Sequence, residues 1–283
     1  MTDSLSGRTI FMSGGSRGIG LAIAVRAARE GARVAFMAKT AEPHPKLPGS
    51  IYTAAEEIEA AGGEALPIVG DIRDADAVET AVAQTVERFG GIDLVVNNAS
   101  AINLAPMRDL EVKRFDLMQQ INARGTFVVT RACLPHLRES EHAHVLTLSP
   151  PLSADPRWLN GHSAYTLSKM GMTMITLGVA ADEAEAGIAA NCLWPRTIIA
   201  TAAVQNLLGG DEAMARSRMP AIVADAAYEI LSRDPRSCTG NAFIDDEVLA
   251  EAGMTDLEPY AGMPDSDLAL DIFVDGWPEP ARS

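Results

Sequence analysis

The sequence predicts an α/β fold, a doubly wound parallel sheet of seven strands with helices on both faces. Two observations predict it. Short apolar runs alternate with longer amphipathic segments along the chain, as is typical of parallel strands that are buried on both faces. A glycine-rich stretch follows the first apolar run and opens a helical pattern, which is the place where such sheets bind nucleotides.

The predicted elements alternate in order. The strands are expected at residues 8–12, 33–38, 65–70, 92–97, 144–149, 188–194 and 241–245. Apolar residues recur at helical spacing over 18–30, 52–62, 75–89, 111–136, 164–186 and 219–232. Three prolines exclude a helix interior from residues 41–50, so a loop is expected there. No glycine- and serine-rich linker divides the chain, which predicts one domain over 1–249 and an acidic extension over 250–283.

The composition excludes several classes of partner. The 283 residues carry a formal net charge of −15, and such a surface repels nucleic acid and anionic membranes. The 3 cysteines form no CxxC pair, so neither a metal site nor a disulfide framework is expected. The first residues lack the apolar core of a signal peptide, and no apolar run is long enough to span a bilayer. We therefore expect a cytoplasmic protein without a membrane span.

The glycine-rich stretch "MSGGSRGIG" has the chemistry of a phosphate-binding loop. Glycine permits the tight turn and lets backbone N–H groups approach a pyrophosphate, while the start of the following helix favours anions. The spacing is Gly-x3-Gly-x-Gly rather than GxGxxG, and a tight turn without a ligand is the alternative. A Rossmann-type cofactor site would use the loop residues Gly14, Ser16, Arg17, Gly18, Ile19 and Gly20.

The end of the second strand favours NADP(H) over NAD(H). In dinucleotide folds, an acidic residue about 20 positions after the glycines binds the ribose 2′-hydroxyl of NAD. Lys39 stands at that place. Its ammonium would attract a 2′-phosphate, and Arg17 could add a second cation. The alternative is that Lys39 is only a solvated strand end.

Polar and small residues follow the next two strands. Asp71 could accept a hydrogen bond from the adenine amino group, with Ile72 against the ring. Asn98 and Ala99 would let the chain pass close to a ribose. Each could be ordinary turn chemistry, but the carboxyl ends of the strands are where open α/β sheets bind their ligands.

Tyr165 and Lys169 lie one helical turn apart and so share a face. A free tyrosine has a pKa of about 10, too high for acid–base work at neutral pH. A nearby ammonium stabilises the phenolate, so we expect Lys169 to lower the pKa of Tyr165. Tyr165 could then donate a proton to a carbonyl oxygen as hydride arrives from a nicotinamide. Packing on a helix face is the alternative.

These motifs together resemble the short-chain dehydrogenase/reductase family. The resemblance runs from about Arg8 to about Asp245 and rests on the glycine loop, "NNAS" at 97–100, Asn122, the Tyr165/Lys169 pair and the N-x3-P of Asn191–Pro195. The segments "AKTAEPHPKLPGSIYTAAEEIEAAGG", "SPPL" and "LWPRT" are similar to one subgroup, the hydroxysteroid dehydrogenase-like proteins, without the sterol-carrier domain of longer members.

The resemblance implies a role for each residue. Tyr165 would be the acid/base, and Lys169 would lower its pKa and hold the nicotinamide ribose. Asn122 would order a water in a proton relay. Pro195 and backbone groups of Ile198 would lie at the nicotinamide carboxamide. Members of the family commonly pair through helices equivalent to 111–136 and 164–186, which implies a homodimer or homotetramer.

The sequence departs from the family pattern at two places. The family places a serine 13 residues before the tyrosine, where this chain has "SPPLS". Ser149 at the strand end is the slightly favoured candidate for the catalytic serine. Ser153 is the second candidate, and the third possibility is that neither acts. Arg196 replaces a glycine after the sixth strand, and we expect it to face solvent.

The expected pocket is apolar, lined by Leu152, Trp158, Leu159 and residues 200–215, and a helix or mobile lid is expected near 200–218. It predicts a small apolar carbonyl or alcohol as substrate, such as a lipid, terpenoid or steroid-like compound. The alternative function is a catalytically weak NADP(H)-binding sensor or interaction protein, because the usual serine is displaced.

Overall fold

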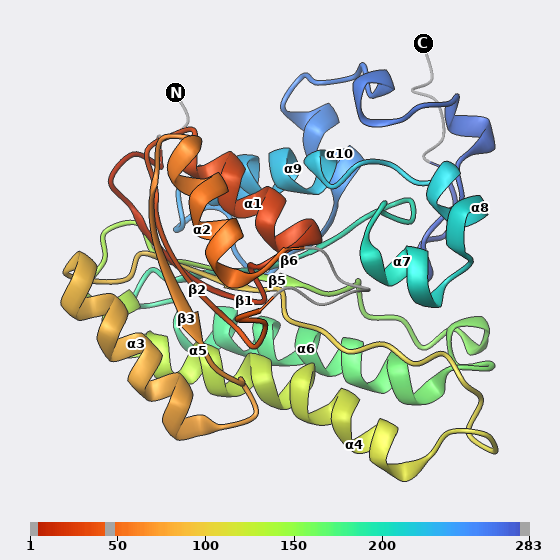
Figure 1. The fold of residues 1–283 in the computed structure, drawn as a ribbon, viewed down its shortest axis with the longest axis horizontal. Coiled ribbons are helices and arrows are strands. Elements are labelled where there is room, and N and C mark those ends of the chain that lie inside the picture. Colours follow the sequence, from red (N-terminus) through yellow and green to blue (C-terminus); the bar gives the residue numbers. More distant parts are fainter. Residues whose placement is uncertain (1–4, 43–48, 278–283) are drawn as a thin grey trace.

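The computed structural model describes residues 5–42 and 49–277, and six residues of the proline-rich loop lie outside this part. Seven strands pair in parallel in the order β3-β2-β1-β4-β5-β6-β7 (Figure 1). They are β1 (Thr9–Ser13), β2 (Arg33–Ala38), β3 (Glu64–Val69), β4 (Leu94–Asn97), β5 (His144–Leu148), β6 (Ala189–Trp194) and β7 (Ala242–Ile244). The predicted doubly wound sheet is confirmed.

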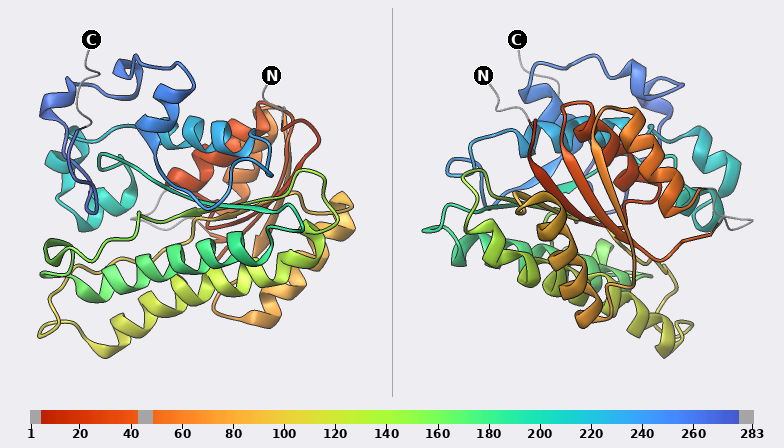
Figure 2. Two further views of the ribbon diagram at one scale, coloured as in Figure 1. Left: turned by 180° about the vertical axis from the view of Figure 1, so that it is seen from behind. Right: turned by 60° about the vertical axis from the view of Figure 1, so that its left-hand side comes forward.

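Helices cover both faces of this sheet (Figures 1 and 2). One face carries α1 (Gly18–Ala28), α2 (Ile51–Ala60), α9 (Ala221–Leu231) and α10 (Asp245–Glu251). The other carries α3 (Ala75–Phe89), α5 (Ala123–Leu137) and α6 (Ser163–Asp182), with α4 (Val112–Ile121) against α5 and α6. Shorter helices are α7 (Ala202–Leu207) and α8 (Gly210–Ala215), and the 3-10 turns are η1 (Pro156–Trp158), η2 (Glu258–Tyr260) and η3 (Asp265–Asp267).

Alternation along the strands builds two apolar cores. In β1, Ile10 and Met12 belong to the core under α1, whereas Phe11 belongs to the core under α3 and α5. Successive strand residues point to opposite faces, so a continuous apolar strand supplies both cores. The sheet order reverses between β1 and β4. The carboxyl ends of the strands at such a reversal are the general binding place of these sheets.

The helix predicted over 111–136 is two helices. It is interrupted at Asn122, whose backbone has φ −73 and ψ −81 between α4 and α5. The side chain of Asn122 holds the backbone of Ala101 through two hydrogen bonds of 2.7 and 3.0 Å. A helical periodicity in sequence cannot reveal this break, because the partner that holds it comes from another segment. Over the expected lid, residues 200–218, the chain forms α7 and α8.

Candidate active site

The glycine loop is built for close backbone approach. Gly14 has φ +79, and a Cβ on it would lie 2.9 Å from the Cα of Ala99. A Cβ on Gly20 would lie 2.4 Å from the side-chain nitrogen of Asn98, which donates a 2.8 Å hydrogen bond to the carbonyl oxygen of Gly14. The loop is thus fastened to the end of β4. It brings Gly14, Gly20, Asn98 and Ala99 together, as a dinucleotide site requires.

Helix α1 begins at Gly18 without a side-chain cap, because Arg17 at its N-cap makes no capping hydrogen bond. The first N–H groups of a helix need partners from outside it, and together with the helix dipole they favour an anion. Gly18 also has φ +57, a conformation that side-chain-bearing residues rarely adopt. These features fit the pyrophosphate of a nicotinamide dinucleotide.

Asp71 and Lys39 lie together, but the Asp71 carboxylate has a further partner. The Nζ of Lys39 is 3.6 Å from Oδ2 of Asp71, and Arg73 binds both carboxylate oxygens at 2.5 to 3.0 Å. Arg73 and Lys39 lower the pKa of the Asp71 carboxyl to about 2, so it is ionised at neutral pH. Arg73 was missed in the sequence, where an arginine two residues after an aspartate carries no distinctive signal. Ile72 is buried in the core under α3 and α5.

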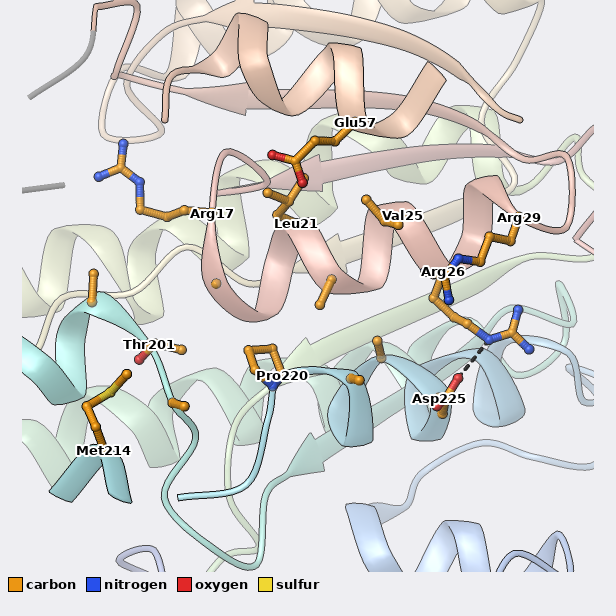
Figure 3. A pocket seen from close by; sticks show the side chains of 16 residues that line it. Arg17, Leu21, Val25, Arg26, Arg29, Glu57, Thr201, Met214, Pro220 and Asp225 are labelled. Atoms are coloured by element: carbon orange, nitrogen blue, oxygen red, sulfur yellow. Dashed lines mark hydrogen bonds and ion pairs between the residues drawn. The ribbon is translucent and has the colours of Figure 1, made fainter. Parts of the chain in front are cut away.

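Arg17 lies on the other side of the glycine loop, where Figure 3 shows it at the rim of a pocket between α1 and α9. Its guanidinium makes one weak hydrogen bond, of 3.5 Å, to the carbonyl oxygen of Gly49. Its Nε is buried and finds no hydrogen-bond partner among the described residues. Burial lowers the pKa of Arg17. The structure therefore shows Arg17 next to the loop but does not bring it to Lys39.

The pocket of Figure 3 has a volume of about 460 Å³ and is mainly apolar inside. It borders the glycine loop at Gly18 and Thr201, and the paired Arg26 and Asp225 close its far end at a distance of 2.8 Å. Tyr165 and Lys169 do not line it. The pocket therefore adjoins the phosphate-binding loop and is separate from the Tyr165/Lys169 pair.

Tyr165 and Lys169 both lie on the buried face of α6, with 4% and 3% of their surfaces exposed. Lys169 donates a hydrogen bond of 2.9 Å from its Nζ to the carbonyl oxygen of Leu148, the last residue of β5. The same Nζ lies 5.2 Å from the ring centroid of Trp194 at the end of β6. The pair is thus placed at the carboxyl ends of two central strands.

The expected lowering of the Tyr165 pKa is wrong for this closed structure. Burial raises the pKa of Tyr165 above its ordinary value, and the carboxylate of Asp271 raises it further. Burial also lowers the pKa of Lys169 to about 7, although Asp271 acts in the opposite direction. Desolvation disfavours the charged form of either group, and both side chains are almost fully buried. The cover over the two residues, rather than their spacing, decides their protonation.

The two candidate serines differ in burial and in their hydrogen-bond partners. Ser149 is fully buried, and its Oγ is 3.0 Å from the hydroxyl of Thr173 on α6. Thr173 also donates to the carbonyl oxygen of Pro150 at 2.7 Å. Ser153 is partly exposed in the following loop, where its Oγ accepts a 3.2 Å hydrogen bond from the backbone of Asp155. In this conformation, the Ser149 hydroxyl has no path to a ligand because protein atoms surround it.

Asn122 is also fully buried. Besides holding Ala101, its side-chain nitrogen donates a 2.8 Å hydrogen bond to Oγ of Ser168 on α6. Ser168 in turn bonds to the carbonyl oxygen of Tyr165 at 2.8 Å. Asn122 thus fastens α4 and α5 to the helix that carries Tyr165.

Arg196 does not face solvent as expected: it is 3% exposed. Its Nε donates to Asp246 at 2.5 Å, its Nη2 pairs with Glu247, and its backbone N–H donates to Asp245 at 2.9 Å. A buried arginine needs carboxylates to balance its charge, and here they come from α10, some 50 residues later in the sequence. The sequence around Arg196 holds no sign of them.

Residues 265–277, which we call the strap, pass over this site beside α7 and α8 (Figures 1 and 2). The backbone N–H of Asp271 donates to the carbonyl oxygen of Arg196 at 2.8 Å, and that of Ile198 donates to Ala269 at 3.0 Å. The Ile198 amide expected at the nicotinamide is therefore taken by the strap. The ring of Phe273 stacks on Tyr165 with 6.2 Å between centroids. Phe273 and Val274 of the extension belong to the same buried cluster as Tyr165.

None of the helices in the described part of the chain combines the length and the apolar character that a membrane crossing requires. No cluster of three or more potential metal-binding side chains occurs in residues 5–42 and 49–277.

Comparison with known proteins agrees with this architecture. Hydroxysteroid dehydrogenase-like protein 2 of Danio rerio is 52% identical over 278 residues, which are 98% of this chain and 66% of the relative. The chain thus spans about two thirds of that relative's length. The structure of a dehydrogenase from Xanthomonas campestris, described as putative, is 55% identical, with a TM-score of 0.93 over 96% of this chain and 100% of the other.

A more distant structure holds a cofactor. A short chain dehydrogenase from Burkholderia cenocepacia in complex with NADP is 27% identical, with a TM-score of 0.72 over 86% of this chain and 97% of the other. The sequence of residues 8–210 itself matches the short chain dehydrogenase family. The chain therefore belongs to the short-chain dehydrogenase family, whose members are oxidoreductases that bind a nicotinamide cofactor.

Proposed function

We propose that this chain is an NADP(H)-dependent oxidoreductase acting on a carbonyl or alcohol group of an apolar substrate. The observation that carries the proposal is the position of Tyr165 and Lys169. They lie together at the carboxyl ends of β5 and β6, in a sheet whose glycine loop is shaped for a pyrophosphate. The proposal rests on this arrangement and on membership of the family.

NADP(H) rather than NAD(H) is proposed from the charges around the adenosine end. Lys39 is 56% exposed at the end of β2, where its ammonium can reach a 2′-phosphate. Arg73 and Arg17 add cations on the two sides of the glycine loop. The NADP complex of the Burkholderia relative supports the same choice.

The nicotinamide, when bound, supplies a hydride to the carbonyl carbon or accepts one from the alcohol. In reduction, the Tyr165 hydroxyl gives its proton to the carbonyl oxygen, and in oxidation it takes the proton back. We propose that Lys169, held at Leu148, stabilises the deprotonated form of the phenol once the cover over the two residues is removed. We propose that Asn122 positions this helix and serves the proton relay. The buried Ser149 hydroxyl needs a local rearrangement before it can bind a carbonyl.

The proposed substrate is apolar because the side chains around Tyr165 are apolar. Met118, Trp158, Trp194, Ile244 and Phe273 pack in one cluster with it. Such a surface suits a lipid, a terpenoid or a steroid-like compound, and the name of the Danio relative points to the steroid class.

We further propose a homodimer or homotetramer, since Phe127, Leu167 and Met174 are 51%, 58% and 64% exposed on α5 and α6. The proposed location is the cytoplasm, where its three buried cysteines stay reduced.

The test is NADPH oxidation with a panel of apolar ketones and aldehydes, comparing the natural chain with Tyr165→Phe. Positioned general acids contribute roughly 100-fold to 10,000-fold, so the variant should lose at least about 100-fold in kcat with NADPH binding unchanged. Tyr52→Phe is the matched control, because Tyr52 is 53% exposed on α2. Equal rates for the natural chain and Tyr165→Phe would contradict the proposal.

The second candidate function is an NADP(H)-binding sensor or interaction protein of weak activity. The specific observation in its favour is that Tyr165 is covered by Phe273, while neither Ser149 nor Ser153 forms a hydrogen bond with it. This function predicts tight NADPH binding by fluorescence titration without turnover of any panel member. Turnover that depends on Tyr165 would exclude it.

A further inference from the structure

The strap, residues 265–277, forms the roof over Tyr165. Its first half pairs with the segment after β6: Thr197 and Leu270 form an antiparallel bridge, and Ala269 donates to the carbonyl oxygen of Arg216 at 2.9 Å. The indole Nε1 of Trp194 donates to the carbonyl oxygen of Ile272 at 2.9 Å. These contacts bring the next residue, Phe273, directly against the tyrosine.

Phe273 fills the space beside the phenol. It is 5% exposed, and its ring meets the Tyr165 ring at 6.2 Å with 24° between the planes. The rings of Trp158, His162 and Trp194 surround it at 5.8, 6.1 and 5.9 Å. Because Tyr165 is only 4% exposed, a substrate carbonyl cannot reach the hydroxyl while this ring stays in place.

The backbone of Phe273 is strained. It has φ +72 and is the one non-glycine residue of the described chain with a positive φ. A bulky aromatic side chain rarely adopts this conformation, which persists only where the surroundings impose it. The ring contacts therefore hold the chain in a conformation that it would leave once they are lost.

Two ion pairs of the strap involve side chains that are open to solvent. Asp275 pairs with Arg157 of η1, and these side chains are 79% and 50% exposed. Asp265 pairs with the buried Arg218 at 2.6 Å but is itself 55% exposed. Ion pairs open to solvent contribute little to stability. The pair of Asp275 with Arg157 is thus a contact that water can replace, whereas the buried Arg196 also donates to the carbonyl oxygen of Gly276 and Arg218 lies over the ring of Trp277 at 5.4 Å.

We propose that the strap is an autoinhibitory cover, in which Phe273 occupies the place of the substrate beside Tyr165 and must leave before substrate can bind. This inference rests on the proposed role of Tyr165 in catalysis. The free protein would alternate between a covered form, which this structure shows, and an open form that accepts substrate. Local openings of this kind require far less free energy than global unfolding.

The opening can be measured without turnover, by the reaction of tyrosines with tetranitromethane followed by peptide mapping. In the natural chain, Tyr52 should react quickly because it is 53% exposed, while Tyr165 should be protected. Phe273→Ala and, separately, Arg157→Ala should raise the rate at Tyr165 about tenfold or more and leave Tyr52 unchanged. Arg88→Ala is the control, since it removes an exposed ion pair, with Glu64, far from the strap.

Hydrogen exchange of the full chain supplies the second readout. The amides of Ala269 and Asp271 should exchange faster in Phe273→Ala and Arg157→Ala, with the strands of the sheet unchanged. The two variants guard against a folding defect, because Arg157→Ala changes a half-exposed side chain that contacts Asp275, Asp155 and the ring of Trp158 and leaves Phe273 itself in the chain. The inference fails if Tyr165 reacts as fast as Tyr52 in the natural chain, or if neither variant changes either readout. Since no turnover is needed, an inactive protein would contradict the proposed function and leave this test intact.

Discussion

The ammonium of Lys169 donates a hydrogen bond of 2.9 Å to the carbonyl oxygen of Leu148. This contact joins α6 to the last residue of β5 and fixes the charge beside Tyr165. It also draws the ammonium into a buried place, and burial lowers the pKa of Lys169 to about 7. Burial of the ammonium, rather than its hydrogen bond to Leu148, therefore makes the charge of Lys169 sensitive to pH near neutrality.

We expect Asp271→Asn to move the pH dependence of carbonyl reduction to lower pH. The proposed reaction needs the Lys169 ammonium, so activity should fall as the pH rises through the pKa of Lys169. The Asp271 carboxylate raises that pKa, and its removal must lower it. Asp271 itself faces Lys169 and Asp245, and burial raises its own pKa to about 7. The natural chain, Asp271→Asn and the control Asp109→Asn, which changes a carboxylate that is 59% exposed beside Arg108, should be compared by kcat/KM across the neutral range. An alkaline limb at the same pH in all three proteins would refute the coupling.

Arg196→Ala should destabilise the fold strongly. Arg196 is 3% exposed and pairs with Asp246, which is also buried. Removing one partner of a buried pair leaves an uncompensated charge and costs about 3–5 kcal/mol. Arg88→Ala removes a pair whose two side chains are 56% and 54% exposed, and should cost about 0–1 kcal/mol. Urea unfolding of both variants measures the difference, and similar losses would show that Arg196 is not structural.

Lys39→Ala should weaken the binding of NADPH and leave that of NADH nearly unchanged. Hydrogen bonds to charged groups are worth about 1.5–3 kcal/mol, which corresponds to a rise of roughly 10-fold to 100-fold in the Kd of NADPH. Lys113→Ala is the control, since Lys113 is 71% exposed beside Glu111 on α4. Fluorescence titration gives the Kd values. If NADPH and NADH bind equally well to the natural chain, the choice of NADP(H) is wrong.

Gly20→Ala should disrupt the phosphate-binding loop. The added Cβ would lie 2.4 Å from the Asn98 side chain and 2.5 Å from the carbonyl oxygen of Gly14. Overpacking of this kind costs about 1–3 kcal/mol and should also weaken cofactor binding. Gly91→Ala meets no atom within 4 Å and should have little effect. Thermal unfolding with and without NADPH separates the two losses, and a Gly20→Ala protein as stable as Gly91→Ala would contradict the tight packing of the loop.

The sequence by itself determined the sheet, the glycine loop and the Tyr165/Lys169 pair. These depend on local information: apolar runs specify buried parallel strands, glycines permit the turn, and a spacing of four residues puts two side chains on one helix face. The same motifs resemble those of one family over most of the chain. The family match of residues 8–210 confirms the family, and the strand order confirms the fold.

Only the tertiary structure decided what surrounds the pair. Phe273 lies 108 residues after Tyr165 in the sequence, yet its ring covers the phenol. Arg196 is buried because carboxylates of α10 receive it, and Ser149 is buried against Thr173 of α6. The environment of a side chain, and with it the pKa of Tyr165 and Lys169, is set by contacts between distant segments. No pattern within a short stretch of sequence contains that information.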